Sequence, residues 1–373
     1  MGIDRGTGQN SIRSKEHNRG LVLQLIATGE CSSRVELAKA TGLAKMTVTN
    51  IISDFIAQGL VEECEEEQTE SCGRNPIRLQ LSSSGPRVVG LLILKDRIEA
   101  VLCSITLEIL KTEEISFVRL EQQQIQFYVC EVLDRLLAEE RNILGIGVAY
   151  GIPADVQQFL EERYRLPVAA DYDCNSAALA EKLFGAGKDA QDFIFLAAAD
   201  HIGSGIVSGG RVYHNPWGMR SALGHMSIDR NGPTCSCGGR GCLEMYAGTN
   251  VVLGKLCRAA GWKMRFPQFC RLSGVAEIEE IMAEMVKNFS VALISSINLL
   301  RPELIILGKD CLDWDDRHVQ MLEEAVNRGL ADSGRAVPVR RAGFGRSAPL
   351  VGAAANVVYQ LFQGRLLFTA ADE

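Results

Sequence analysis

The sequence predicts an α/β protein with two parts, an N-terminal winged helix-turn-helix and a larger body of two lobes. Helix-periodic segments followed by two short β-rich runs fill residues 15–81, and the later residues alternate between β-rich and helical segments. The length of 373 residues also exceeds what one ordinary core accommodates. The expected division is a tail at 1–14, the winged domain at 15–81, a linker at 82–87, lobe I at 88–175 plus 347–366, and lobe II at 176–346.

The composition is that of a soluble globular protein, with 47% apolar and 23% charged residues. No apolar run is long enough to span a membrane, and the polar N-terminus lacks the apolar core of a signal peptide, so we expect a cytoplasmic protein. Most of the 12 cysteines stand alone in apolar surroundings, which indicates reduced thiols. The net charge of −7 gives no global sign of nucleic-acid binding, although residues 1–50 carry a small positive excess.

The winged domain is predicted from helix signals in chain order. Residues 16–31 place apolar side chains at helical spacing, and Gly29 interrupts the pattern. Ser33 and Glu36 form a capping box, which predicts the start of a second helix. Three residues then fall at the spacing of a helix-turn-helix: Ala38, Gly42 and Val48.

The next helix has the pattern of a recognition helix. Its inward stripe consists of Val48, Ile51, Ile52 and Phe55. Mostly short polar side chains remain on its outer face and can reach base edges and phosphates. The candidate DNA-binding residues are Arg34, Lys45, Met46, Thr47, Thr49, Asn50, Ser53 and Arg74.

Two β-rich runs after Gly59 predict a β-wing, with Arg74 near its tip and able to enter a minor groove. Six glutamates between residues 62 and 70 would repel phosphate, so we expect them to point away from DNA. The alternative is a small helical bundle with a hairpin and no role in DNA binding.

The body alternates strands and helices, which predicts an α/β class with strands ending in glycine-bearing loops at a ligand cleft. The first β-rich runs, 88–110, turn at Lys95-Asp96. Residues 166–187 predict a strand, a loop and a helix, and residues 193–213 a hairpin with Gly203 and Gly205 at its bend. The other expected elements are a helix at 121–140, a strand at 143–153, a helix at 276–299, a strand at 303–310 and a closing helix at 348–362.

Residues 224–248, GHMSIDRNGPTCSCGGRGCLEMYAG, combine three cysteines, a histidine and several glycines. Three thiolates and one imidazole are the ligand set of a closed tetrahedral zinc site, and the glycines allow tight turns. A disulfide is disfavoured because we expect a reducing, cytoplasmic compartment and because two cysteines one residue apart are too close for a relaxed bridge. A catalytic thiol is disfavoured because no second acid-base group lies nearby in the sequence to activate it. The segment therefore predicts a structural Zn²⁺ held by His225, Cys235, Cys237 and Cys242.

The chain resembles the ROK family (repressor, open reading frame, kinase) in its transcription-regulator branch, over residues 15–363. Three stretches carry the resemblance: the winged helix ending in GRNPIRL, the cysteine segment, and DYDCNSAALAE, which is similar to the family's sugar-site loop. The resemblance implies a two-lobe, actin-like (ribonuclease H-like) body. It also implies that His225 and Glu244 face a sugar and that Asp173 takes the position of the kinase catalytic base.

The chain departs from the kinase pattern at several positions. Its opening hairpin reads ILKDRIEA, without the glycines and threonine of a DxGGT-type phosphate loop, so we expect no ATP binding and no enzyme activity. Gly308-Lys309 stands where the family pattern has a Gly-Gly pair in its adenine loop. In the sugar site, Tyr172 stands for an Asn and Ala222 for a Glu, and the loop between GIPADV and LPVAADYD is short. Asp173 has an alternative role as a helix N-cap.

We therefore expect a DNA-binding transcriptional regulator, a repressor of carbohydrate-related genes. It would bind two half-sites of a double-stranded operator as a homodimer or homotetramer. Its effector would be a sugar, a sugar phosphate or a partner protein in the altered sugar site, made of Tyr172, Asp173, Ala222, His225 and Glu244. The alternatives are an ATP-dependent sugar kinase with a regulatory head, in which Asp173 is catalytic, and a zinc-stabilised interaction module without a small ligand.

Overall fold

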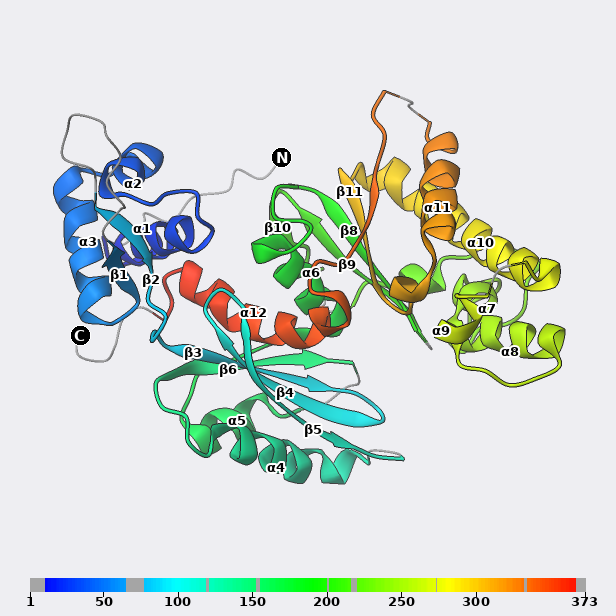
Figure 1. Cartoon of the computed structure of the whole chain (residues 1–373), viewed down its shortest axis with the longest axis horizontal. Helices are drawn as coiled ribbons and strands as arrows, with labels where there is room; N and C mark the ends of the chain where they lie inside the picture. Colours follow the sequence, from blue (N-terminus) through cyan, green and yellow to red (C-terminus); the bar gives the residue numbers. More distant parts are fainter. Residues whose placement is uncertain are drawn as a thin grey trace. The chain divides into compact units, whose positions relative to one another are not determined.

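The structure, a computed structural model, describes residues 11–64, 77–118, 121–151, 155–199, 201–215, 220–272, 274–331 and 334–366. The chain forms two compact units (Figure 1). The first holds the residues up to Asp171 together with those from Ala353 onward, and the second spans Tyr172–Gly352. No helix among the described residues is long and apolar enough to cross a membrane.

The N-terminal head has three helices and a two-stranded wing: α1 (Ser11–Ala27), α2 (Arg34–Thr41), α3 (Lys45–Ala57), β1 (Val61–Cys64) and β2 (Arg78–Leu81). Ser33 caps α2, and the backbone and side chain of Glu36 complete the predicted capping box. Gly42 ends α2 with φ +69°, a left-handed conformation that a glycine adopts without strain. β1 and β2 pair antiparallel. The predicted inward stripe of α3 is buried throughout: Val48, Ile51, Ile52 and Phe55.

A five-stranded sheet of order β5-β4-β3-β6-β7 forms the rest of the first unit. Its strands are β3 (Arg87–Ile93), β4 (Arg97–Ser104), β5 (Ile109–Ser116), β6 (Ile143–Tyr150) and β7 (Val168–Tyr172). The helices α4 (Ile125–Leu137), which follows η1 (Gln122–Gln124), and α5 (Gln157–Tyr164) lie on one face, and α12 (Ala348–Phe362) lies on the other (Figure 1). A Cβ on Gly147 would come within 1.7 Å of the Ala353 carbonyl oxygen, so glycine lets α12 pack directly on β6.

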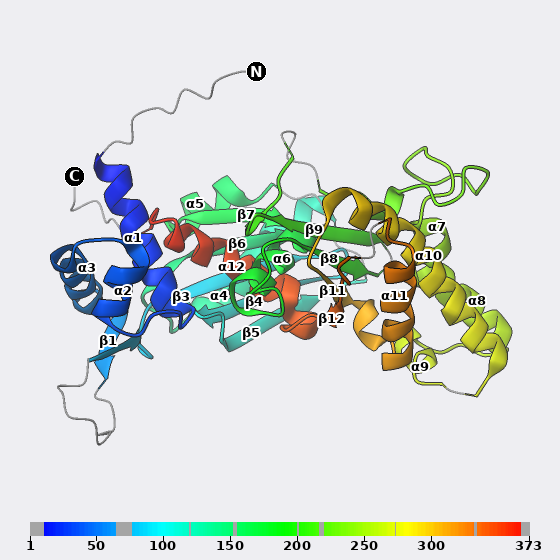
Figure 2. The same ribbon diagram turned by 90° about the horizontal axis from the view of Figure 1, so that it is seen from above.

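The second unit has a sheet of order β10-β9-β8-β11-β12. Its strands are β8 (Phe193–Ala198), β9 (Ile202–Ser208), β10 (Arg211–Val212), β11 (Leu304–Lys309) and β12 (Val339–Arg341). Its helices are α6 (Asp173–Phe184), η2 (Leu223–His225), α7 (Glu244–Ala247), α8 (Thr249–Ala260), α9 (Phe266–Phe269), α10 (Ala276–Leu300), η3 (Asp310–Asp313), α11 (Asp316–Arg328) and η4 (Gly345–Ser347). Helix α10 contacts both α8 and α11 (Figure 2).

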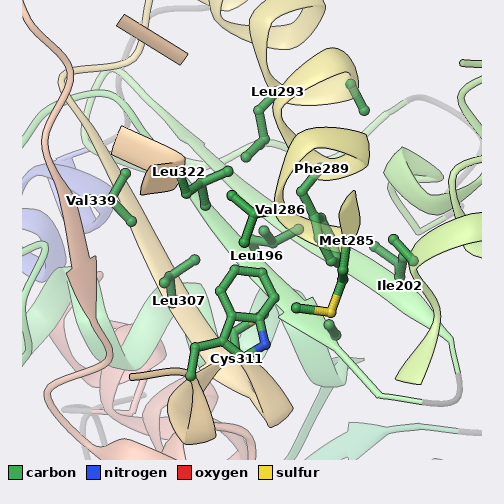
Figure 3. Packing of buried hydrophobic residues seen from close by; sticks show 14 of the residues in the cluster. Leu196, Ile202, Met285, Val286, Phe289, Leu293, Leu307, Cys311, Leu322 and Val339 are labelled. Atoms are coloured by element: carbon green, nitrogen blue, oxygen red, sulfur yellow. The ribbon is translucent and has the colours of Figure 1, made fainter. Parts of the chain in front are cut away.

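The core of the second unit lies where α10 covers the sheet. Phe289 and Leu293 of α10 pack in one buried cluster with Leu196 of β8 and Leu307 of β11 (Figure 3). Each of these side chains is fully buried, so the cluster holds the strands that carry the candidate site in place.

Two sequence predictions are wrong in this unit. The predicted loop before α6 is absent, because α6 begins at Asp173 directly after the last residue of β7. Gly203 and Gly205 lie within β9 and not at the bend of the hairpin. A Cβ on Gly203 would come within 2.7 Å of the Cys174 sulfur, and one on Gly205 within 2.3 Å of the Cys174 carbonyl oxygen. Both glycines therefore make room for the first turn of α6.

Candidate functional site

The four predicted metal ligands come together in one cluster. The ligand atoms of His225, Cys235, Cys237 and Cys242 all lie within 4.8 Å of one another. The Cys235 sulfur lies 3.6 Å from His225 Nδ1. The Cys237 and Cys242 sulfurs also lie 3.6 Å apart. Cys235 and Cys242 are buried, while His225 and Cys237 are exposed, so the cluster opens to solvent on one side.

Glycines and short-range backbone bonds shape the loop that carries this cluster. Gly238 and Gly241 have φ of +89° and +64°, a region that favours glycine. The Cys235 N–H donates to the Gly239 carbonyl at 2.8 Å, which closes the turn between the first two cysteines. A hydrogen bond from the backbone N–H of Cys237 lowers the pKa of the Cys235 thiol to about 6. Burial raises the pKa of the neighbouring Cys242 thiol to about 12, so Cys235 is the readier thiolate of these two.

The spacing of the four donors fits a tetrahedral ion. With Zn–S bonds of about 2.3 Å and Zn–N bonds of about 2.0 Å, tetrahedral angles place two sulfurs roughly 3.8 Å apart and sulfur and nitrogen roughly 3.5 Å apart. Both measured separations, 3.6 Å, agree with these values to within a few tenths of an ångström. The four donors are therefore a candidate metal-binding cluster.

The start of β9 brings the separate candidate motifs to one place. The backbone N–H of Ile202 donates to Glu244 Oε2 at 3.0 Å, and His201 Nδ1 lies 3.1 Å from Glu244 Oε1. A Cβ on Gly224, next to His225, would come within 2.4 Å of the Ile202 carbonyl oxygen. The next residue of the strand, Gly203, lies against Cys174. Ile202 and Gly203 at the start of β9 thus contact three parts of the candidate site: Glu244, Gly224 beside His225, and Cys174 at the start of α6.

Asp173 is buried and forms an ion pair that sequence analysis did not anticipate. Its Oδ2 lies 2.5 Å from the ammonium of Lys309, and its Oδ1 accepts a hydrogen bond from the Cys174 N–H at 2.9 Å. The predicted alternative role as an N-cap is wrong, because the N-cap of α6 is Tyr172 and no side chain caps that end. Asp173 is instead the first helical residue.

Lys309 occupies an unusual backbone conformation for a lysine. Its φ of 52° and ψ of −125° lie in a region that only glycine enters without strain. Burial alone would lower the pKa of Lys309, but Cys174, Asp173 and Asp310 raise it above the ordinary value. The lysine is therefore charged, and its contact with Asp173 is an ion pair.

The two altered positions of the predicted sugar site differ in their surroundings. Tyr172 is half-buried, and the guanidinium of Arg220 lies over its ring, 5.5 Å from the centroid. Ala222 is exposed and contributes neither charge nor a hydrogen-bonding side chain. Ser221, between Arg220 and Ala222, shares a 2.6 Å hydroxyl–hydroxyl hydrogen bond with Ser204 of β9. Arg220 is therefore tethered close to the strand against which Cys174 packs.

The predicted recognition helix presents its polar residues to solvent. Five of the six candidate side chains on this helix are exposed: Lys45, Met46, Thr47, Asn50 and Ser53. The sixth, Thr49, is half-buried. Met46 retains 71% of its surface. Thr49 Oγ1 donates to the Lys45 carbonyl at 2.9 Å, so its hydroxyl is used within the helix.

The two arginines predicted to contact DNA differ in what the structure shows of them. Arg34 forms an ion pair with Glu63 of the wing, 2.6 Å between nitrogen and oxygen, so its charge is partly compensated. Arg74 lies outside the described residues. The Arg34–Glu63 pair also gives one of the wing carboxylates a partner, which sequence analysis did not anticipate.

Sequence analysis missed Lys309 and Arg220 as members of the site. Lys309 and Asp173 lie 136 positions apart, and their pairing depends on β11 and α6 meeting at one end of the sheet. Gly308-Lys309 stands where the family pattern has a Gly-Gly pair, and this difference was a usable signal. A charged lysine at a position that favours glycine suggests that the charge has a partner nearby. Arg220 carried no comparable signal.

Comparison with known proteins places this chain in a family. Residues 98–359 match the model of the ROK family. The xylose repressor of Bacillus subtilis (strain 168) is 25% identical over 372 residues, which cover 92% of this chain and 95% of the repressor.

Solved structures agree in fold. A ROK family transcriptional regulator, described as a homolog of the E. coli MLC protein, matches with a TM-score of 0.80 and 21% identity over 95% of this chain and 98% of its own. The ROK hexokinase of Thermus thermophilus matches with a TM-score of 0.63 and 27% identity over 72% of this chain and 97% of its own. The family match covers more than half of the sequence, and the chain described here therefore belongs to the ROK family.

Proposed function

We propose that the protein is a sugar-responsive transcriptional repressor that binds a double-stranded DNA operator through α3. The observation that carries this proposal is the division of α3 into a buried apolar stripe and an exposed polar face on a helix-turn-helix. Such a helix fits the major groove with its N-terminal residues toward base edges. The name of the similar xylose repressor supports regulation of carbohydrate-related genes. We place such a DNA-binding regulator in the cytoplasm.

Within this proposal the exposed residues divide by chemistry. Asn50 can form a bidentate pair with adenine, and Ser53 and Thr47 can bond to bases or phosphates. Lys45 supplies charge to the phosphate backbone at the start of the helix. Arg34 contacts phosphate only if it exchanges Glu63 for DNA, and Arg74 is proposed as a minor-groove contact at the wing tip.

We assign the body two roles, effector binding and assembly. The effector, a sugar or sugar phosphate, would bind among Tyr172, Asp173, Ala222, His225 and Glu244. A structural Zn²⁺ at the four-residue cluster would keep His225 and Glu244 in position, because the histidine is itself a ligand and the glutamate follows the last cysteine by two residues. A homodimer or homotetramer would present two heads to two half-sites.

Phosphoryl transfer is the second candidate, since the similar hexokinase belongs to the same family. Two observations weigh against it. The turn between β3 and β4 is closed by a hydrogen bond from Leu94 N–H to the Arg97 carbonyl, with Lys95 and Asp96 where a kinase needs glycines. Asp173, at the base position, is already paired with Lys309. We therefore propose a ligand-binding body without kinase activity.

The DNA-binding proposal is tested with a duplex selected from a random-sequence library by the full-length protein. Asn50→Ala should weaken binding by about 1–3 kcal/mol and relax the base preference at one position. Lys45→Ala should weaken binding to all sequences and reduce the salt dependence by roughly one counterion. The control is Gln58→Ala, an exposed residue at the far end of α3. Fluorescence anisotropy over a salt series measures both effects. The proposal fails if no sequence is enriched, or if Asn50→Ala binds like the control.

A further inference from the structure

The outward face of α3 carries a methionine opposite the buried apolar stripe of this helix. With about 3.6 residues per turn, Met46 points away from the middle of the stripe, and Asn50 and Ser53 follow it at i+4 and i+7 on the same face. Met46 retains 71% of its surface, so its thioether chain lies in solvent. The face that we assign to the major groove therefore begins with an apolar side chain at its centre.

Met46 brings no charge to this face. Its neighbours in the chain, Lys45 and Thr47, are exposed and polar, and the proposed function gives each of them a role toward phosphates or bases. A methionine side chain is unbranched and apolar, and its sulfur is only a weak hydrogen-bond acceptor. Single exposed apolar side chains are common on protein surfaces. Met46 differs from these because it is the second residue of α3, at the end of a recognition helix whose residues reach base edges.

One base presents an apolar group in the major groove. Thymine shows its 5-methyl group beside the O4 acceptor, whereas guanine, adenine and cytosine are distinguished there by hydrogen-bond donors and acceptors. The minor groove displays no methyl group, so a methyl contact also identifies the groove. The flexible, unbranched chain of a methionine can adapt to the position of such a methyl group.

We propose, on the basis of the proposed function, that Met46 is a specificity-determining residue that packs on the 5-methyl group of a thymine in the operator. Asn50, one turn further along α3, would read an adenine close to that thymine. Residues four apart are separated by about 6 Å along the helix axis, and successive base pairs by about 3.4 Å. The thymine should therefore lie within about two base pairs of the position that Asn50 reads.

The test uses the duplex that the full-length protein selects from the random-sequence library. Each thymine of this duplex is replaced in turn by deoxyuridine, which removes the methyl group and keeps every hydrogen-bonding group of the base. We expect at least one replacement, near the position relaxed by Asn50→Ala, to weaken binding roughly fourfold, which corresponds to about 0.8 kcal/mol for one buried methyl group. Fluorescence anisotropy at one fixed salt concentration measures each affinity.

Three variants assign the methyl effect to Met46. Met46→Ala should weaken binding to the thymine duplex roughly fourfold or more, and it should bind the thymine and deoxyuridine duplexes with equal affinity. Met46→Leu keeps an apolar side chain and should keep part of the thymine preference. The control is Val35→Ala on α2, whose side chain is 62% exposed. It removes an exposed apolar side chain from the same helix-turn-helix and should leave the thymine preference unchanged.

The outcomes separate the thymine contact from the repressor proposal. Three results would each overturn the contact: a selected duplex without a thymine near the Asn50 position, no weakening by any deoxyuridine replacement, or a thymine preference that Met46→Ala retains. Each of these results leaves the repressor proposal intact, because the selection has then yielded an operator. If no sequence is enriched, the repressor proposal fails and the thymine contact fails with it. A thymine preference that Met46→Ala abolishes and Val35→Ala preserves establishes the contact.

Discussion

Replacing Cys237 with serine tests the metal cluster at its most accessible cysteine. Cys237 is exposed, so the substitution removes little buried surface and acts through metal coordination. Loss of one of the four ligands should release the ion and so open the loop between His225 and Cys242, which spans about 18 residues; a cross-link closing a loop of this length contributes on the order of 3 kcal/mol through the unfolded state. In a unit of this size each kcal/mol corresponds to about 2–4 °C, so the melting temperature should fall by about 6–12 °C.

The assay is thermal unfolding of the full-length protein followed by fluorescence, with metal content measured by mass spectrometry. Treatment of the unmodified protein with a zinc chelator should produce a similar decrease. Cys257→Ser is the matched control, because Cys257 is half-buried on α8 and lies outside the cluster. The metal assignment is refuted if the purified protein contains no metal. It is also refuted if the Cys237→Ser variant and the chelated protein have the same melting temperature as the Cys257→Ser control.

Two further predictions concern the region around Asp173. Gly205→Ala would place a Cβ 2.3 Å from the Cys174 carbonyl oxygen, so it should destabilise the second unit by about 1–3 kcal/mol in chemical denaturation. Gly254→Ala, whose Cβ would have its nearest neighbour at 3.7 Å, is the control and should be neutral or stabilising; equal stability of the two variants would contradict the helix-packing role. In a coupled ADP-release assay with a sugar panel, we expect no turnover, and turnover that Asp173→Asn abolishes would establish the kinase alternative.

The head was predictable because its signals are local. The capping box at Ser33 and Glu36 and the turn at Gly42 each depend on residues within a few positions of one another, and the structure contains all of them. The apolar stripe of α3 follows from helical periodicity alone. The cysteine cluster was predictable for the same reason, since its four ligands lie within one short, glycine-rich segment.

The failures concern contacts between distant segments. Glycines in a β-rich segment predict a bend, but Gly203 and Gly205 serve a helix that packs across their strand, and sequence spacing does not show which helix that is. The pairing of Asp173 with Lys309 likewise requires knowing that α6 and β11 end close together. Motif analysis assigned Asp173 from its neighbours in the chain and could not supply its partner in space.

The chain crosses between the two units at Asp171–Tyr172 and at Gly352–Ala353, and both crossings adjoin α6. The first immediately precedes Asp173. At the second, a Cβ on Gly352 would come within 2.3 Å of the Ser176 carbonyl, so α12 starts in close contact with α6. Helix α12 then continues without interruption to Phe362, where a Cβ on Gly20 of α1 would come within 2.2 Å of its carbonyl oxygen. Helix α12 therefore contacts α6 within the second unit and α1 within the first, so one continuous helix belongs to the packing of both units.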